Sequence, residues 1–203
     1  MIKKLALAAA IIGIIFYSLS GSKPSASAYF AQLNKFRRDK NQSLRQSEES
    51  PLPAAQKANF DSLKYYPGDP NFEIAATISR IEKPDTTLVP MSDNRSEKYL
   101  RWGTATFTLD NAPQQLLLLL KATGRDSALF VPFTDLTNGH DSYGGGRYLD
   151  VALPKSDETK ITLDFNRAYN PYCAYNSEYS CPVPPGENRL RAAIPAGEKS
   201  FHD

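Results

Sequence analysis

The stretch YLRWGTATFTLDNAPQQLLLLL, residues 99–120, decides the fold class of this chain. In its first half, Gly103, Ala105 and Phe107 alternate with threonines, and a period of two residues is typical of a β-strand. The stretch ends in five consecutive leucines, residues 116–120. A short apolar run between turn residues is typical of a strand buried on both faces, although periodicity alone also allows a helix. We therefore expect two strands here, the second of them buried on both faces.

Similar short runs recur on both sides of this stretch, at spacings of about ten residues with turn signals between them. Residues 86–91 and 99–110 form a predicted hairpin across the polar loop 92–98. The other predicted strands cover residues 72–81, 116–120, 129–133, 147–153, 160–165 and 189–194. This pattern predicts a mainly β fold, an antiparallel barrel or sandwich of about eight strands with two N-terminal helices.

Two helices are expected before the first strand. The first covers residues 29–49, and its apolar side chains form one narrow face: Phe30, Leu33 and Phe36. Its second half has little to bury, so we expect it to lie on the surface or to fray. Ser50 followed by proline is typical of a helix start and predicts a second helix ending near Leu63. We expect residues 29–71 to pack as a helical segment on a β domain of residues 72–203, forming one folding unit.

The N-terminus has the pattern of a secretory signal peptide, residues 1–28. Lys3 and Lys4 precede an apolar run over residues 5–19, and residues 26–28 match an A-x-A cleavage site. The apolar run is short for a spanning helix, which needs about 20 residues. We therefore expect the signal to be removed and the protein to be exported to the periplasm, the cell envelope or the medium. The alternative is an uncleaved N-terminal anchor in the membrane.

The charge of the chain excludes two classes of partner. The chain has 24 basic and 22 acidic residues, and the predicted signal holds three of the basic residues, Lys3, Lys4 and Lys23, but no acidic one. The mature chain is therefore close to neutral. It lacks the basic surface expected of a protein that binds nucleic acid or an anionic membrane.

A second unusual stretch, DFNRAYNPYCAYNSEYSCPVPPGEN, residues 164–188, holds both cysteines of the chain. In an exported chain, two cysteines predict a disulfide between Cys173 and Cys181, which would stabilise the fold by about 2–4 kcal/mol. The alternatives are a free or catalytic thiol and a two-cysteine metal site. A metal site needs further ligands, but the two histidines, His140 and His202, lie far along the chain. No metal or cofactor is therefore expected.

Three motifs carry a resemblance to a known family: FTDLTNGHDSYGGGRYL over residues 133–149, the stretch 164–188, and IPAGE over residues 194–198. They resemble an uncharacterised bacterial family catalogued as domain of unknown function 1684. The resemblance implies a mostly β domain, found in exported and cytoplasmic bacterial proteins. It implies no particular reaction, because the family has no agreed biochemical function.

Three carboxylates within these motifs are candidate catalytic residues: Asp135, Asp164 and Glu187. Two carboxylates in unlike environments can act as acid and base, which is the basis for an alternative function, a hydrolase with an Asp/Glu pair. The structural alternative is that the aspartates cap turns after strands. A buried Asp164 could instead pair with Arg147 or Arg189.

Six tyrosines accompany the motifs: Tyr143, Tyr148, Tyr169, Tyr172, Tyr175 and Tyr179. Tyrosine offers an apolar face and a polar tip, so these rings could line a cleft for a sugar or another small ligand, or cover one end of a barrel. Our leading hypothesis is an exported binding or envelope-associated module with a polar, tyrosine-rich cleft. Its partner would be a small polar ligand or an envelope component. The predicted ligand-binding residues are Asp135, Tyr143, Arg147, Asn166, Asn170, Tyr175, Glu187 and Asn188.

A further interpretation gives these motifs no ligand at all. Their polar side chains would form a network that fixes a long loop, and the function would lie elsewhere on the molecule. The two interpretations differ in whether the polar groups face solvent or other protein groups.

Overall fold

The computed structural model describes residues 25–122 and 128–202. The apolar run of the predicted signal peptide lies outside these ranges. Its predicted cleavage site, residues 26–28, forms the first turn of helix α2 (Ala26–Gln46). Within the described ranges, no helix is both long and apolar enough to cross a membrane.

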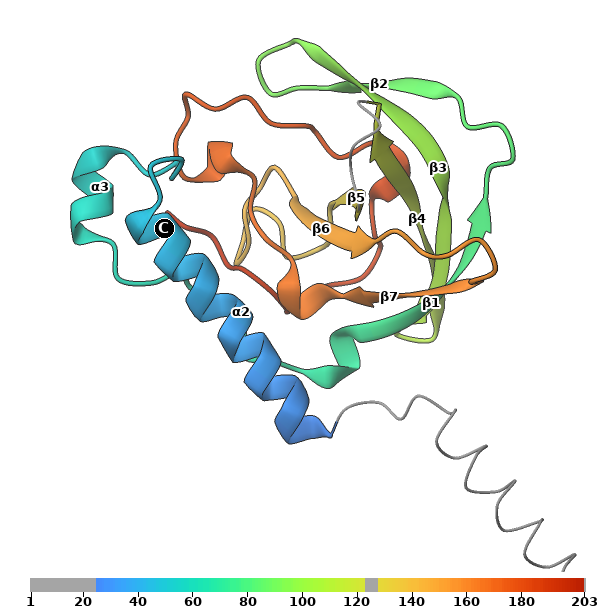
Figure 1. Cartoon of the computed structure of the whole chain (residues 1–203), viewed down its shortest axis with the longest axis horizontal. Helices are drawn as coiled ribbons and strands as arrows, with labels where there is room; N and C mark the ends of the chain where they lie inside the picture. Colours follow the sequence, from blue (N-terminus) through green and yellow to red (C-terminus); the bar gives the residue numbers. More distant parts are fainter. Residues whose placement is uncertain (1–24, 123–127, 203) are drawn as a thin grey trace, which may run out of the picture.

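In the described part of the chain, seven antiparallel strands wrap into a nearly closed barrel (Figure 1). Their order is β6-β5-β4-β3-β1-β7, with β2 paired to β3, and residues of β6 and β7 line one hollow at the seam of the barrel. The strands are β1 (Glu73–Arg80), β2 (Thr86–Pro90), β3 (Ser96–Leu109), β4 (Ala112–Lys121), β5 (Ala128–Phe133), β6 (Arg147–Ala152) and β7 (Lys160–Asp164). The predicted mainly β fold is confirmed.

A β-bulge in β3 changes which side chains reach the core. The register between β3 and β4 shifts between Arg101 and Gly103, and a Cβ on Gly103 would lie 2.6 Å from the Ser79 carbonyl oxygen, so glycine is required there. An extra residue in a strand moves the following side chains to the opposite face. Tyr99 therefore belongs to a cluster outside the main core, whereas Phe107 has the same sequence parity and belongs to the main core.

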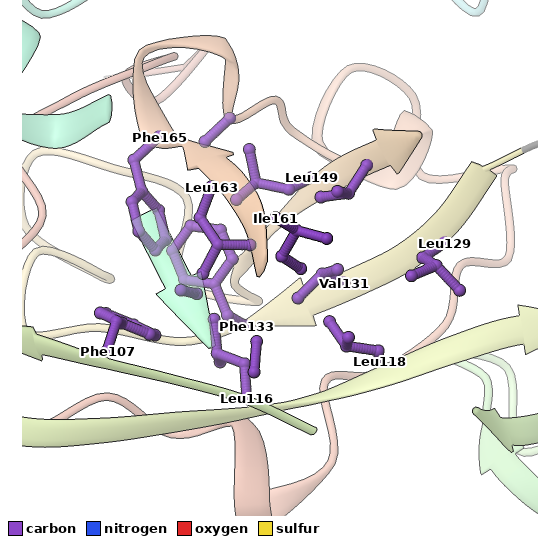
Figure 2. Packing of buried hydrophobic residues seen from close by; sticks show 14 of the residues in the cluster. Phe107, Leu116, Leu118, Leu129, Val131, Phe133, Leu149, Ile161, Leu163 and Phe165 are labelled. Carbon is purple, nitrogen blue, oxygen red and sulfur yellow. The ribbon is translucent and has the colours of Figure 1, made fainter. Parts of the chain in front are cut away.

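The five-leucine run is a strand buried on both faces, as predicted. Leu116 and Leu118 point into the main core of the barrel, where they meet side chains from β5, β6 and β7 (Figure 2). Leu117 and Leu119 point the other way, into the outer cluster that also contains Tyr99. The side chains of β4 therefore pack in two clusters, one inside the barrel and one on its outer face.

The predicted strand over residues 189–194 is not formed, and this is a correction. The segment makes one isolated bridge, between Thr134 and Arg189, and is otherwise irregular. Leu190 and Ile194 are buried in the main core, which explains the apolar pattern. The backbone amide of Leu190 donates to the Thr134 carbonyl, and the Ile194 carbonyl accepts from a side chain. The backbone groups are thus satisfied without a regular strand partner.

The N-terminal helices differ from their predicted extents. The second helix, α3 (Ala54–Asn59), is shorter than expected, because the hydroxyl of Ser50 donates to the Leu44 carbonyl at the end of α2 instead of starting a new helix. The second half of α2 is also not a free surface. Leu44 is buried in a cluster with Leu52, Leu63 and Tyr175. Figure 1 shows α2 outside the barrel, beside the segment that follows β7.

Candidate functional site

Arg147, the first residue of β6, is the centre of a buried polar network. Its guanidinium forms an ion pair with Asp135 at 2.8 Å, and both side chains are fully buried. The same guanidinium donates to the carbonyl oxygens of Ile194, Ala196 and Glu198. Asp135 in turn accepts from the backbone amide of Ile194 at 3.1 Å. This network ties the C-terminal segment to the end of the barrel, and it leaves neither charge facing solvent.

The glycine before Arg147 lets this network form. Gly146 has a φ of 92°, a backbone conformation that residues other than glycine rarely adopt. A Cβ at this position would lie 2.6 Å from the Phe133 carbonyl oxygen and 2.8 Å from Pro184. The chain therefore needs glycine here to bring β6 and its arginine against the end of β5.

Glu198 forms a second buried centre, to which the sequence analysis gave no role. One of its carboxylate oxygens accepts from the Tyr175 hydroxyl and from the backbone amide of Asn170. The other lies 2.6 Å from the ammonium group of Lys40 in α2. Burial, followed by the nearby carboxylate of Glu198, raises the pKa of Tyr175 well above its ordinary value. Tyr175 therefore stays protonated and donates to the carboxylate, and α2 is fastened to the C-terminal segment.

The three predicted asparagines are buried and bind backbone groups. Asn166 exchanges two hydrogen bonds with the backbone of Asp69. Asn170 donates from its side chain to the Lys199 carbonyl at 2.8 Å. Asn188 accepts from the Leu117 amide and donates to the carbonyls of Leu117 and Pro132. Each amide thus serves as a connector between segments that are distant in sequence.

The three candidate catalytic carboxylates lie in three separate settings. Asp135 pairs with Arg147 in the interior. Asp164 lies 3.1 Å from Arg167 and accepts from the Tyr29 hydroxyl at 3.0 Å. Glu187 forms a two-point ion pair with Arg101 at the surface, at 2.6 and 3.0 Å. Each of the three carboxylates therefore has its own cation, and none of them is hydrogen-bonded to another.

A different group of residues forms an open hollow on the outside of the barrel. It has a volume of about 410 Å³, within the usual range of small-ligand sites, about 300–1,000 Å³. Four of its residues are tyrosines from the predicted set, Tyr148, Tyr169, Tyr172 and Tyr179. The rest of its lining includes Met91, Glu97, Tyr99, Lys121, Phe130, Pro171, Ser180, Cys181 and Pro182. We call this site the tyrosine hollow. None of the eight residues predicted to bind the ligand lines it.

Four aromatic rings packed against one another form the floor of the tyrosine hollow. Phe130 stacks on Tyr99 and meets Tyr148 edge to face, with ring centroids 5.6 and 4.8 Å apart, respectively. Tyr148 contacts Tyr169 edge to face at 5.8 Å. The hydroxyl of Tyr169 donates to Asp150 at 2.9 Å. Burial first, and then Asp150, raises the pKa of Tyr169, so this hydroxyl remains a donor under ordinary conditions.

Two further rings stand at the open side of the hollow. Tyr172 and Tyr179 are 47% and 37% exposed and contact each other edge to face at 5.4 Å. Neither hydroxyl makes a hydrogen bond with any residue that the structure describes. Lys121 and Glu97 supply one charge of each sign to the lining. The hollow thus combines exposed aromatic faces, uncommitted hydroxyl groups and a pair of charged side chains.

A second hollow adjoins the first and is bounded by α2. Its volume is about 530 Å³, and it is lined by Phe36, Lys40 and Leu44 of the helix together with Tyr169 and Tyr172. The last two residues also line the tyrosine hollow. The ammonium group of Lys40 lies 4.4 Å from the centre of the Tyr169 ring. The position of α2 therefore shapes one side of the tyrosine hollow.

The sequence analysis missed Tyr99 and Phe130 as lining residues. Tyr99 shares its parity along the sequence with the core residues Ala105 and Phe107, and only the bulge at Gly103 places it outside. A glycine inside an alternating strand was the one available signal, because glycine at such a position often marks a bulge.

Cys173 and Cys181 are both free thiols in the structure, so the predicted disulfide is not formed there. The backbone amide of Cys173 lies 3.2 Å from the sulfur of Cys181, so the two residues are neighbours. The Tyr143 hydroxyl lies 3.7 Å from the sulfur of Cys173. In residues 25–122 and 128–202, no group of three or more His, Cys, Asp or Glu side chains is placed to hold a metal ion.

Comparison with known proteins identifies relatives but no activity. The sequence profile of a family described as "Protein of unknown function (DUF1684)" matches residues 58–199. The chain is similar to an uncharacterised protein of Haloarcula marismortui with a solution NMR structure, at 37% identity and a TM-score of 0.71, over 87% of this chain and 97% of that chain. No curated protein matches the chain. The function must therefore be argued from the site itself.

Proposed function

We propose that this chain, which belongs to the DUF1684 family of proteins of unknown function, is a binding module that holds a small polar ligand in the tyrosine hollow. The ligand has one apolar face and several hydroxyl or amide groups, as a sugar ring does. Tyr172 and Tyr179 contact its apolar face, and the charged side chains of Lys121 and Glu97 contact its polar edge.

One observation carries this proposal: five tyrosines and one phenylalanine from separate parts of the chain converge on one open hollow. Tyr99, Phe130 and Tyr148 come from three strands of the barrel, and the other rings come from the segment after β7. Sites for small ligands are mostly apolar with a few polar anchors, and tyrosine supplies both properties with little conformational freedom to lose.

The stability of the hollow's floor supports a binding role. Tyr148 is 5% exposed, and its hydroxyl donates to the Pro182 carbonyl, which connects β6 to the loop that carries Tyr179. A preformed site loses less entropy when it binds than a flexible one does. The strands that carry its floor belong to the barrel, and the leucines of β4 pack in the interior of that barrel.

The proposal includes a location outside the cytoplasm, with a retained N-terminal membrane anchor as the alternative. The supporting features are the lysines, the apolar run over residues 5–19 and the A-x-A pattern at residues 26–28. Cleavage after Ala28 would make Tyr29 the first residue. Tyr29 is buried, and its hydroxyl donates to Asp164 at 3.0 Å, so the new end of α2 would still be held against the barrel.

The test is a titration of the isotope-labelled protein with N-acetylglucosamine, glucose and maltose, followed by amide chemical shifts. We expect at least one sugar to shift the resonances of residues 171–182 and of β5. Tyr172→Ala and Tyr179→Ala should each weaken binding about tenfold, which corresponds to about 1.4 kcal/mol.

The matched control is Leu136→Ala, because Leu136 is an exposed apolar residue outside the hollow. It should leave the affinity unchanged. Absence of shifts with all three sugars, or equal affinities for the tyrosine variants and the wild type, would contradict the proposed function.

A further inference from the structure

The two cysteines have different surroundings. Cys173 lies in the short helix η3 (Tyr172–Ala174) and is partly exposed. Cys181 is buried and is fixed to the turn after β2, where its amide donates to the Ser92 hydroxyl at 3.1 Å and its carbonyl accepts from the Ser92 amide at 2.9 Å. Cys173 is therefore the more exposed of the two residues, and Cys181 is the one held in place by backbone contacts with Ser92.

We propose that Cys173 and Cys181 form a redox-active dithiol that reacts with small disulfides, with Cys173 as the attacking thiol and Cys181 as the resolving thiol. This inference concerns a reaction of the protein itself and does not depend on ligand binding in the tyrosine hollow. It differs from a structural disulfide because the pair is expected to open and close in the folded protein.

The surroundings of Cys173 favour its thiolate, the form that attacks a disulfide. A hydrogen bond with the Cys181 thiol lowers the pKa of Cys173 to about 6, against the opposing effect of burial, and a hydrogen bond from Tyr143 lowers it further. Burial and the adjacent thiolate in turn raise the pKa of Tyr143 to about 12. Tyr143 is therefore a donor to the thiolate and acts as a positioning residue.

The surroundings of Cys181 suit the second step. The hydrogen bond with Cys173 and its burial raise its pKa, so it stays protonated and unreactive until the first thiol has been consumed. The Cys173 amide at 3.2 Å from its sulfur keeps the two residues together. A partly exposed attacking thiol and a less exposed resolving thiol beside it are the parts that a dithiol exchange reaction needs.

The reaction balances with a small disulfide, RSSR, as the oxidant. The Cys173 thiolate attacks one sulfur, the S–S bond of RSSR breaks, and RS⁻ leaves and takes up a proton. The Cys181 thiol then loses its proton and attacks the sulfur of Cys173, and the second RS⁻ leaves and takes up that proton. The protein dithiol is oxidised to a disulfide, and RSSR is reduced to two RSH.

The test treats the reduced full chain with oxidised glutathione at neutral pH and follows the products by intact mass. The wild type should lose two hydrogens without retaining glutathione. Cys181→Ser should stop at a stable adduct with one glutathione. Cys173→Ser should react at least about tenfold more slowly, because its remaining thiol belongs to the buried Cys181.

Tyr143→Phe tests the positioning role. In this variant, which keeps both cysteines, iodoacetamide should modify the dithiol more slowly than in the wild type at pH 6.5. The two rates should be equal at pH 9, where formation of the thiolate no longer depends on the tyrosine hydroxyl. Three results would overturn the inference: equal rates for the two serine variants, a stable glutathione adduct on the wild type, or a disulfide that dithiothreitol reduces only after denaturation. The last result would identify a structural staple.

Discussion

The buried polar network around Arg147 and Glu198 and the tyrosine hollow are built from the same stretches of sequence, yet they face opposite ways. Asn170, Tyr172 and Tyr175 are almost adjacent in the chain. Asn170 and Tyr175 are buried against Glu198, whereas Tyr172 is exposed at the hollow. Polar residues that the sequence analysis assigned to a ligand site therefore form hydrogen bonds inside the protein. Tyrosines that could have covered one end of the barrel are instead exposed to solvent. The comparison predicts large stability effects in the network and small ones in the hollow.

The largest effect is expected for Arg147→Met. The substitution leaves the Asp135 carboxylate buried without its cation, and breaking one partner of a buried pair costs about 3–5 kcal/mol. Urea unfolding followed by circular dichroism measures the change. Leu136→Ala, beside Asp135 but exposed, is the control and should stay within about 0.5 kcal/mol of the wild type. A small effect of Arg147→Met would show that the network does not hold the fold.

Lys40→Met should cost about 2–3 kcal/mol, because it removes the cation from the buried Glu198 carboxylate, while part of the lysine side chain is solvent-exposed. The matched control lies in the same helix. Lys35 pairs with Asp39 at the same distance of 2.6 Å, but both side chains are exposed, so Lys35→Met should cost about 0.5 kcal/mol or less. Equal losses for the two variants in thermal unfolding would mean that α2 is not fastened through Glu198.

Gly146→Ala should cost about 1–3 kcal/mol through backbone strain. The added Cβ would collide with the Phe133 carbonyl oxygen at 2.6 Å, in a conformation of positive φ. Gly144→Ala is the control, because its Cβ would meet its nearest neighbour at an ordinary 3.7 Å. Differential scanning calorimetry of both variants compares them directly. A stable Gly146→Ala protein would contradict the role of this glycine in placing Arg147.

The smallest effect on stability is expected for Tyr172→Phe, within about 0.5 kcal/mol, because its hydroxyl makes no hydrogen bond with a described residue. Tyr175→Phe is its counterpart in the network and should cost about 1–3 kcal/mol, since Glu198 then loses a buried donor. Parallel urea titrations measure both. A reversal of this order would remove the distinction between the two regions.

Much of the fold was predictable because the hydrophobic pattern is local. The alternation over residues 99–110 and the leucine run correctly identified two neighbouring strands, β3 and the buried strand β4. The segment 189–194 was misassigned because its apolar residues do pack in the core. Apolar patterning reports burial, and it does not report whether a strand partner is available.

The candidate site was less predictable. Four of the six tyrosines expected near a cleft do line the hollow, whereas Tyr175, which follows Tyr172 closely in the chain, is buried against Glu198. The polar residues were placed in the predicted site because sequence does not reveal their partners. Asn188 shows why: it binds the backbone of Leu117 and Pro132, residues far from it in the chain.

The sequence by itself determined the antiparallel β architecture, the helix at the N-terminus and the presence of a tyrosine-rich loop with two cysteines. Only the tertiary structure decided that Asp135 meets Arg147, that Glu198 meets Lys40, and that Tyr99 faces outward. The physical reason is the range of the interactions. Hydrophobic periodicity is set by neighbours a few residues apart. Buried ion pairs, and the face to which side chains point beyond a bulge, depend instead on contacts across the whole barrel.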